Sequence, residues 1–316
     1  MKKLIGKLLL LAILTALSLA LLTAVVFAFA APQFKGEYTG AIVDKIERAE
    51  SIDEPKIVLI GNSNLAFGID SETIEEAFGR PVVNMGGHGG LGNEFHINMG
   101  RHGINEGDIV VIAFTSYGEV SSLTPDLAWI TVENHGLWDL IPEEDYYDVI
   151  KAFPHYAIRT IGRWLTGTGN KPRDGIYSAA AFNEYGDISQ VRDQSMMQDF
   201  DGISAPPVLG DTVALLNEYI AWCNEQGAIC VVAAYPIITC DSLPPNAAAF
   251  DHFTAMLDAA LDCDVISDYK DYFMDRRYFY DTTAHLTDEG TVIRTAQLIE
   301  DLKNWSGFEE HLKSAE

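Results

Sequence analysis

The chain has 316 residues, and its 46 acidic and 21 basic residues give a formal net charge of −25 at neutral pH. A charge of this sign and size excludes nucleic acid as a partner, because the phosphate backbone would repel the protein. An acidic balance of this kind is typical of a soluble domain in an extracytoplasmic or salty setting. The length is enough for one large α/β domain with an additional segment, or for two modest domains.

The N-terminus carries three lysines, and a run without charged residues follows from 8 to 31. About 20 apolar residues are enough to cross the hydrocarbon core of a bilayer. Because no basic cluster follows the run, residues 1–7 are expected in the cytoplasm and the rest of the chain outside it. The sequence Ala28-Phe29-Ala30 resembles a signal-peptidase site, but a cleavable apolar region usually has about 7 to 15 residues. We therefore expect a single-pass, uncleaved anchor in the cell membrane.

Residues 32–54 are predicted to form a juxtamembrane linker with a short polar helix. The folded domain is expected over residues 55–305, and a short tail over residues 306–316. Continuously apolar runs within the domain predict strands buried on both faces, as in parallel sheets. These runs cover residues 56–60, 81–85, 108–114, 230–235 and 264–266.

Helical patterns alternate with these strands. The first is expected to begin at Asp70 or Ser71, which can cap it, and to end at Gly79. The last is expected to have Thr287 as its N-cap. Strands that alternate with helices predict a doubly wound, flavodoxin-like parallel α/β sheet with right-handed crossovers. This last helix is predicted over residues 288–302, and the others over residues 94–99, 213–225 and 247–261.

The alternation is interrupted between residues 119 and 205, and we interpret this segment as an insertion after the third strand. It contains a predicted helix over residues 143–165. The apolar residues of this helix, among them Ile150, Phe153 and Trp164, are expected to pack onto the core. The segment also holds the most basic stretch after the anchor, which we hypothesise to contact lipid phosphates or an anionic glycan. Its basic residues are Arg159, Arg163, Lys171 and Arg173.

The four cysteines have no spacing typical of zinc. Outside the cytoplasm they could form disulfides. The strand assignment puts Cys223, Cys230 and Cys263 near the N-terminal edge of the sheet and Cys240 near the opposite edge. A disulfide would therefore join two of the first three, and buried free thiols are the alternative.

No metal or organic cofactor is expected. The residues His88, His96 and His102 lie within 15 positions of one another, but separations of eight and six match no face of a helix. The glycine-rich loop 86–90 is not followed by the Lys-Ser/Thr pair that binds nucleotide phosphates. His88 alone is a candidate to line a pocket.

Ser63 and His285 lie at opposite ends of the folded part of the chain, each in a short polar motif after a strand-like run. A serine hydroxyl is a poor nucleophile until a base takes its proton, and a carboxylate orients that base. Loops at the carboxyl ends of parallel strands meet in one crevice. We therefore expect Ser63, His285 and Asp281 to lie together there. The alternatives are a plain turn at Ser63 and a backbone-capping role for Asp281.

These motifs resemble those of the SGNH/GDSL hydrolase family. The family's first block is Gly-Asp-Ser-Leu, where residues 61–64 read Gly-Asn-Ser-Asn, and its second, Asn-x-Gly-x-x-Gly, matches residues 84–89. The final Asp-x-x-His block is matched by residues 281–285, with one extra residue between Asp and His. The resemblance covers about residues 55–305. It is nearest to the membrane-anchored branch found beside membrane-bound O-acyltransferases and, more distantly, to the accessory protein of lipoteichoic-acid D-alanylation.

The resemblance implies an SGNH-type fold and a serine esterase or acyltransferase that acts on acyl or acetyl esters of a cell-surface glycan. It assigns Ser63 as the nucleophile, His285 as the base and Asp281 as the orienting carboxylate. The backbone N–H of Gly89 would stabilise the oxyanion. A membrane-bound O-acyltransferase would be a partner.

The family's third block, Gly-x-Asn-Asp, is replaced here by Thr-Ser-Tyr-Gly at residues 115–118, so its Asn donor is missing. We expect Tyr117, Ser116 or Asn93 to take its place. Loss of one oxyanion donor typically lowers the rate about 100 to 1,000-fold. The missing donor and the longer Asp-to-His spacing favour a second hypothesis. In it, the domain is a non-catalytic protein that presents a glycan or a carrier to a membrane acyltransferase.

Overall fold

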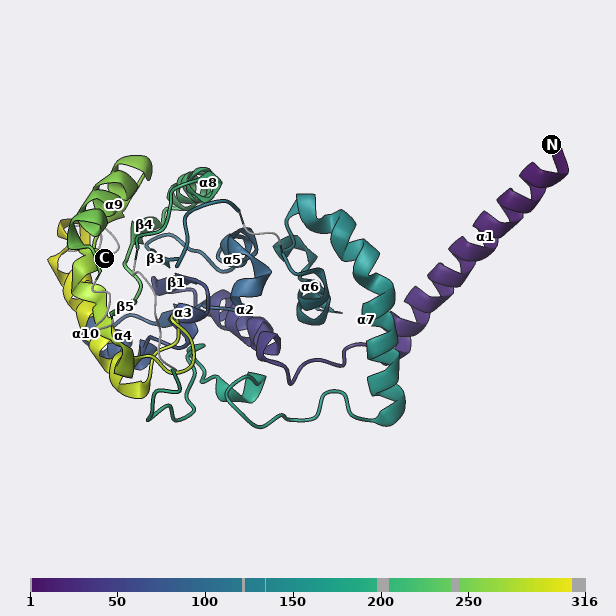
Figure 1. The fold of residues 1–316 in the computed structure, drawn as a ribbon, viewed down its shortest axis with the longest axis horizontal. Helices are drawn as coiled ribbons and strands as arrows, with labels where there is room; N and C mark the ends of the chain where they lie inside the picture. The colour runs from purple at the N-terminus through teal and green to yellow at the C-terminus, as the bar shows by residue number, and fades with distance from the viewer. Residues whose placement is uncertain (1, 121–122, 134, 198–204, 240–244, 309–316) are drawn as a thin grey trace.

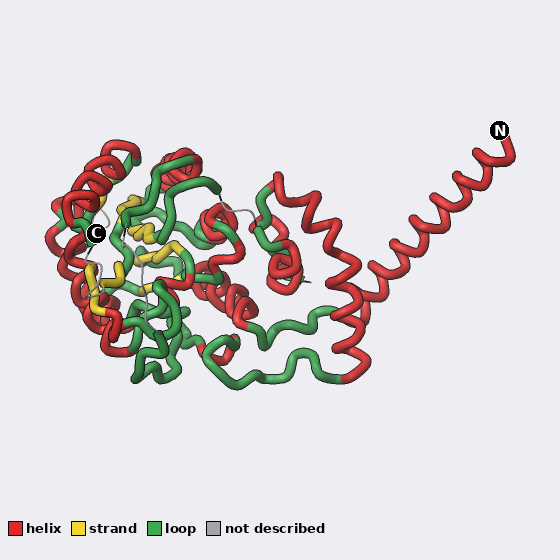
Figure 2. Tube along the Cα trace, in the orientation of Figure 1, coloured by secondary structure: helices red, strands yellow, loops and turns green. Residues whose placement is uncertain are grey.

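The computed structural model describes residues 2–120, 123–133, 135–197, 205–239 and 245–308. It contains a sheet of five parallel strands in the order β2-β1-β3-β4-β6. Strands of this sheet lie among the helices of the domain (Figures 1 and 2). This confirms the predicted parallel α/β sheet. Its strands are β1 (Ile57–Gly61), β2 (Val82–Asn84), β3 (Ile109–Ala113), β4 (Ile229–Val232) and β6 (Asp264–Val265).

The sheet is covered by helices on both faces (Figure 1). Along β1, Val58 and Ile60 belong to one apolar cluster, whereas Ile57 and Leu59 belong to the other. Because successive side chains of a strand point to opposite faces, a strand buried on both sides is continuously apolar. Helices α2 (Ala41–Ser51), α5 (Asn93–Met99) and α8 (Asp211–Glu225) contribute to the first cluster, and α4 (Ser71–Phe78) and α10 (Asp288–Asn304) contribute to the second.

The predicted helix ends are confirmed where a capping residue marked them. The Asp70 carboxylate accepts a hydrogen bond from the Thr73 N–H at the start of α4. Gly79 ends this helix in the left-handed conformation, with φ of 65°, which glycine adopts without strain. At the start of α10, the Thr287 hydroxyl accepts a hydrogen bond from the Gly290 N–H.

Some short elements were not predicted. The strands β5 (Ile237–Thr239) and β7 (Phe273–Asp275) form a separate two-stranded parallel sheet. Helices α3 (Ser63–Ala66) and α6 (Pro125–Val132) were also missed. Runs of three to eight residues carry too little periodicity to mark an element by themselves. The predicted helix over residues 247–261 is present as α9 (Ala247–Ala260).

The range 32–54, predicted as a juxtamembrane linker with a short polar helix, belongs to the folded body. It contains α2, whose inner face is buried at Ile42, Ile46 and Ala49. These positions are separated by four and three residues, so they form one apolar stripe on the helix. The same stripe includes Lys45, which is also buried.

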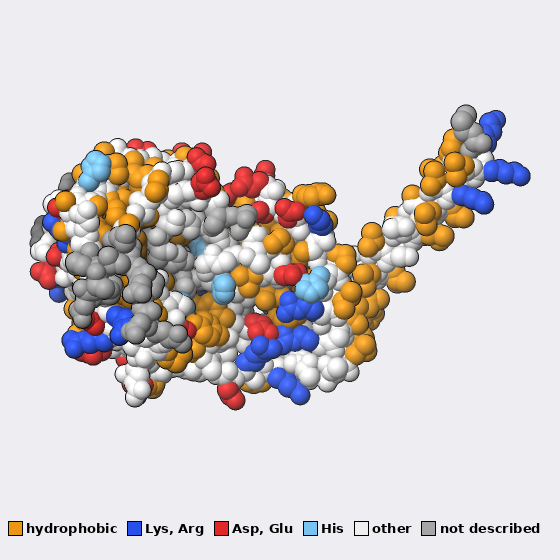
Figure 3. Space-filling model, viewed as in Figure 1, with side chains coloured by type: hydrophobic (Ala, Val, Ile, Leu, Met, Phe, Trp, Pro, Cys, Tyr) orange, Lys and Arg blue, Asp and Glu red, His pale blue; other side chains and the backbone are white. Residues whose placement is uncertain are grey.

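The apolar N-terminal helix projects away from the domain (Figure 1). Helix α1 (Lys2–Val25) has no buried residue, and it continues into the π-helical turn η1 (Val26–Ala30). Together they are long and apolar enough to cross a membrane. In Figure 3 apolar side chains extend along this helix and basic side chains stand near its tip. The turn η1 is different, because Val26 and Ala30 are buried against the domain.

Two further helices lie between β3 and α8. Helix α6 packs against α7 (Tyr146–Thr166), and both lie beside the sheet on the side from which α1 leaves (Figure 1). The Trp129 ring of α6 lies 5.1 Å from the Phe153 ring and 4.9 Å from the Tyr156 ring, and its indole N–H donates to the Val149 carbonyl. The short 3₁₀ turns of this segment are η4 (Trp138–Leu140), η5 (Glu143–Asp145) and η6 (Ala179–Ala181).

Candidate active site

Ser63 lies directly after β1, as the first residue of α3. The residue before it, Asn62, has an extended backbone and caps the helix by accepting a hydrogen bond from the Asn64 N–H. The chain therefore turns sharply from strand to helix at Ser63. This turn leaves the half-buried hydroxyl at the carboxyl end of the central strand.

The structure brings Ser63, His285 and Asp281 together. The Nε2 atom of His285 lies 2.9 Å from the Ser63 Oγ, and its Nδ1 atom lies 2.8 Å from the Asp281 Oδ1. Both distances are within the normal range of hydrogen bonds. A proton on Nδ1 would be donated to the carboxylate, which leaves Nε2 to accept from the serine. The three groups thus have the relative order of a serine, its base and the carboxylate that orients the base.

Two aromatic residues hold the imidazole and the carboxylate in place. The Phe67 ring stacks on the His285 ring at 3.8 Å between centroids and 9° between planes. The Tyr177 hydroxyl donates to the Asp281 Oδ2 and lies 3.3 Å from the His285 Nδ1. Both oxygens of Asp281 therefore have a partner. Neither Phe67 nor Tyr177 was predicted, since no motif marks them.

The pKa of His285 is lowered from its ordinary value of 6.5. Burial is the largest cause, because it disfavours the charged ring, which is only 7% exposed. The hydrogen bond and the charge of Asp281 act in the opposite direction, whereas the nearby Arg192 and His88 lower the pKa further. The imidazole is therefore neutral at pH 7, as a base that accepts a proton must be.

Buried polar contacts fix the turn that carries Ser63. The Asn62 Nδ2 donates to the Thr115 Oγ1 at 2.7 Å, and the Asn64 Nδ2 donates to the Ala113 carbonyl at 2.8 Å. Both contacts tie the turn to the end of the neighbouring strand. Arg294 of α10 donates to the Asn64 carbonyl at 2.5 Å and to its Oδ1 at 2.6 Å. Burial lowers the pKa of Arg294 to about 10, so its guanidinium stays charged at neutral pH.

Hydrogen bonds with Asn84 and Lys45 hold the glycine-rich loop that follows β2. The Asn84 Oδ1 accepts a hydrogen bond from the Gly86 N–H at 2.9 Å. The buried Lys45 Nζ donates to the Gly86 carbonyl at 2.5 Å and to the Gly186 carbonyl at 2.7 Å. Burial lowers the pKa of Lys45 to about 7, although the charge of Asp187 acts in the opposite direction. The lysine thus joins this loop to the segment between β3 and α8.

The same loop lies beside the serine turn, since Gly87 forms a parallel bridge with Asn62. Gly89 is exposed and opens the 3₁₀ turn η3 (Gly89–Leu91). As the first residue of the turn, it has a backbone N–H with no partner inside that turn. The side chain of His88 accepts a hydrogen bond from the Gly90 N–H at 3.0 Å. The His88 ring lies 6.0 Å from the Tyr38 ring, which in turn lies 6.1 Å from the Tyr177 ring.

The three residues predicted to supply a further oxyanion donor have other partners. Tyr117 is fully buried, with its hydroxyl 3.4 Å from that of Tyr269. The Asn93 Nδ2 donates to the Ser116 carbonyl at 3.1 Å, and the exposed Ser116 Oγ accepts from the Gly118 N–H at 3.4 Å. No hydrogen bond or ring contact joins any of them to Ser63 in the described part of the chain. The donor role predicted for them therefore gains no support.

The cysteines form no disulfide among the residues that the structure describes. Cys223, Cys230 and Cys263 are free, so the alternative of free thiols holds for these three. Cys240 lies outside the described residues. Within the same described ranges, no three His, Cys, Asp or Glu side chains are grouped so that they could hold a metal ion.

We predict that Arg294→Met will lower the free energy of unfolding by about 2 to 3 kcal/mol, because two buried oxygens of Asn64 lose their donor. Chemical denaturation of the full chain in detergent measures this change. The matched control is Arg277→Met, since Arg277 is exposed and exposed substitutions usually change stability by less than about 0.5 kcal/mol. Equal stability of the two variants would mean that Arg294 does not brace the turn.

Comparison with known proteins gives no match, because no family model, curated protein or solved structure matches the chain at a significant level. The resemblance to the SGNH/GDSL hydrolases therefore stays a prediction from the motifs. The geometry around Ser63 stands independently of it.

Proposed function

We propose that this chain is a membrane-anchored serine hydrolase of SGNH/GDSL type, acting as an esterase or an acyltransferase. The observation that carries the proposal is the continuous contact from Ser63 through His285 to Asp281, with distances of 2.9 and 2.8 Å. A hydroxyl next to a neutral imidazole whose other nitrogen meets a carboxylate is the arrangement that activates serine.

In the proposed mechanism, the Ser63 oxygen attacks an ester carbonyl while His285 takes the serine proton. The carboxylate of Asp281 stabilises the resulting imidazolium. Backbone N–H groups of Ser63 and Gly89 donate to the oxyanion. The carbon–oxygen bond of the ester then breaks, and His285 gives its proton to the leaving alcohol. Water or a sugar hydroxyl attacks the acyl-serine next, with His285 as the base, to release an acid or a new ester.

Packing at the domain end of the apolar helix supports an uncleaved anchor. Cleavage after Ala30 would remove Val26, which is fully buried, and Phe27, whose ring stacks on that of Phe153 at 6.1 Å. With the N-terminal lysines in the cytoplasm, the domain lies outside the cell. The proposed substrate is then an acyl or acetyl ester of a cell-surface glycan, and the proposed partner is a membrane-bound O-acyltransferase.

One observation favours a second function. The side-chain amide of Asn93 is used by the Ser116 carbonyl, and Tyr117 is buried, so neither completes an oxyanion site beside Ser63. A domain with an incomplete oxyanion site would present a glycan or a carrier to a membrane acyltransferase without catalysis of its own. The two functions differ in the nucleophilic reactivity of Ser63, which is high in a hydrolase and low in a protein that only presents its ligand.

We expect a fluorophosphonate probe to label the full-length chain, because the probe reacts only with an activated serine. Ser63→Ala should abolish the labelling, which gel fluorescence and peptide mass spectrometry can measure. Ser51→Ala is the matched control, since Ser51 is an exposed serine at the end of α2 for which no role in the site is predicted. An unlabelled wild-type chain would contradict the enzyme and leave the presenting role.

The rate of ester hydrolysis should fall in acid with an inflection below pH 6.5. The pKa of His285 lies below 6.5, so the neutral base is present above that pKa and is lost as the pH falls through it. Phe67→Leu should move the inflection upward, because burial is the largest cause of the lowered pKa. The measurement is kcat/KM for a small acetyl ester against pH. An inflection above pH 7 in the wild type would contradict its assignment to the lowered pKa of His285.

Gly89→Pro should lower kcat about 100 to 1,000-fold, since it removes one backbone donor to the oxyanion. The preceding His88 has φ of −70° and ψ of 119°, a conformation that a following proline accepts. Gly89→Ala is the matched control, because a Cβ there would meet no atom within 4 Å. Similar kcat values for both variants would remove Gly89 from the proposed oxyanion site.

A further inference from the structure

Helix α7 has an exposed apolar face that the fold of the domain does not explain. Phe153 packs onto the core as predicted, but Ile150 and Trp164 do not. Positions along the helix separated by about three, four or seven residues share a face. The exposed face consists of Tyr147, Ile150, Ile158 and Leu165, which are 74%, 65%, 70% and 73% exposed.

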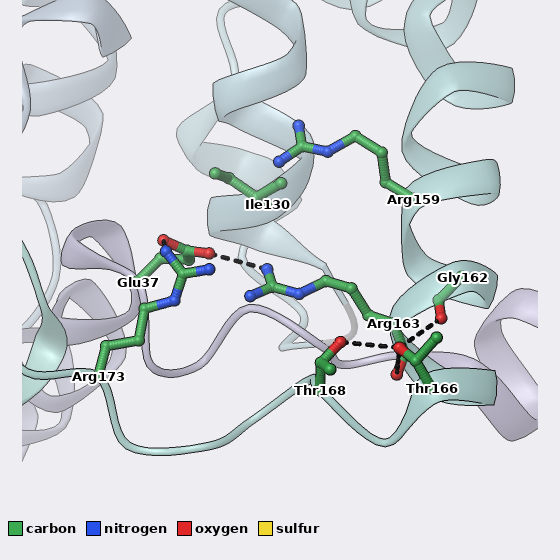
Figure 4. A pocket seen from close by; sticks show the side chains of 8 residues that line it. All are labelled: Glu37, Ile130, Arg159, Gly162, Arg163, Thr166, Thr168 and Arg173. Carbon is green, nitrogen blue, oxygen red and sulfur yellow. Dashed lines mark hydrogen bonds and ion pairs between the residues drawn. The ribbon is translucent and has the colours of Figure 1, made fainter.

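A basic pocket adjoins this apolar face. It has a volume of about 520 Å³, and Arg159, Arg163 and Thr166 of α7 line one side of it (Figure 4). Arg173 and Glu37 line it from the facing segments. Three guanidinium groups and one carboxylate leave the pocket positively charged, within a chain of net charge −25. On the face drawn in Figure 3, basic side chains gather near the base of the apolar helix.

Contacts within the protein hold the arginine side chains of the pocket in place without a ligand. Glu37 accepts from Arg163 at 2.8 Å and from Arg173 at 2.7 Å, one arginine on each carboxylate oxygen. The guanidinium of Arg163 also lies 4.4 Å from the centre of the Phe34 ring, and that of Arg159 lies 5.1 Å from it. No ion pair of Arg159 with a carboxylate is present in the described part of the chain. Its charge is therefore available to an anion.

The pocket is fixed relative to the end of the apolar helix. The η1 residue Phe27 stacks on Phe153 of α7, so the helix end rests on the same helix that lines the pocket. Asn170, just beyond α7, donates to the Pro32 carbonyl at 2.5 Å and accepts from the Lys35 N–H at 3.2 Å. Helix α7, which carries the basic pocket and the exposed apolar face, therefore lies beside the end of α1 (Figure 1).

We propose that this pocket binds the phosphate of an anionic membrane lipid, while the apolar face of α7 rests in the membrane interface. A helix with one apolar face and flanking basic residues is typical of interfacial binding. Planar guanidinium groups bind phosphate oxygens in pairs. The proposal rests on the proposed anchoring by α1, but not on the chemistry of Ser63.

A lipid fits these observations better than a soluble anion does. A soluble anionic glycan would satisfy the arginines but leave Ile158 and Leu165 in water. Free phosphate would occupy only a small part of the pocket. Only a phospholipid supplies the charge for the pocket and the apolar surface for the neighbouring face of α7.

The test measures lipid retained by the full-length chain. The chain is purified in mild detergent, incubated with equal amounts of phosphatidylglycerol and phosphatidylcholine, and repurified, and the bound lipid is quantified by mass spectrometry. We expect phosphatidylglycerol to be enriched. Arg159→Gln should reduce the enrichment about fivefold, the effect of one basic side chain near an anionic surface. This variant leaves both bonds of Glu37 intact, so it should fold.

The matched control is Arg277→Gln, an exposed arginine outside the pocket, which should retain the wild-type enrichment. The proposal would be overturned if the wild type retained the two lipids equally. It would also be overturned if Arg159→Gln and Arg277→Gln reduced the enrichment of phosphatidylglycerol by the same factor. The proposal would also be overturned if soluble polyglucuronate or inorganic phosphate displaced the lipid and if Arg159→Gln weakened the binding of that anion as much as it weakened the binding of the lipid. Ser63→Ala should retain lipid like the wild type, which separates this result from the hydrolase proposal. A chain found in the soluble fraction of cells would instead contradict the anchor.

Discussion

Arg294 joins the two ends of the folded domain at the point where the candidate site forms. Its guanidinium donates to two oxygens of Asn64, so α10 is fixed to the turn after β1. The residue His285 lies only a few positions before α10, whose cap is Thr287. The imidazole therefore meets Ser63 because the helix behind it is held to the neighbouring residue. A buried guanidinium is costly to desolvate, and hydrogen bonds to both oxygens offset this cost only while the turn keeps its shape.

Buried arginines stabilise the backbone around the candidate site. Arg192 donates to the Ile188 carbonyl at 2.9 Å, and Arg294 donates to the Asn64 carbonyl. Charge-assisted hydrogen bonds of this kind are stronger than neutral ones, so they can hold loops that lack regular structure. The charge of Arg192 also disfavours a second proton on His285. Arg192 thus both stabilises the backbone near the candidate site and favours the neutral form of the His285 imidazole.

The sequence was sufficient for the parallel sheet and for the approach of Ser63 to His285, because apolar runs mark buried strands and parallel strands end at one edge. Arg294 could have been found as well, since it lies four and eight residues before two buried leucines on the same helix face. Tyr177 could not, because its position depends on the path of an irregular segment. The burial of Tyr117 could not be predicted, because a place after a strand does not show whether the side chain turns into the core.

The junction between α1 and the domain has a mechanical consequence. Since η1 and residues 32–35 are packed rather than loosely extended, no slack tether separates α1 from the folded body. In the proposed orientation, the domain tilts and rotates only together with its membrane helix. The volume that the domain can reach is then confined to a thin layer at constant height above the lipid, and the proposed glycan substrate would have to enter that layer.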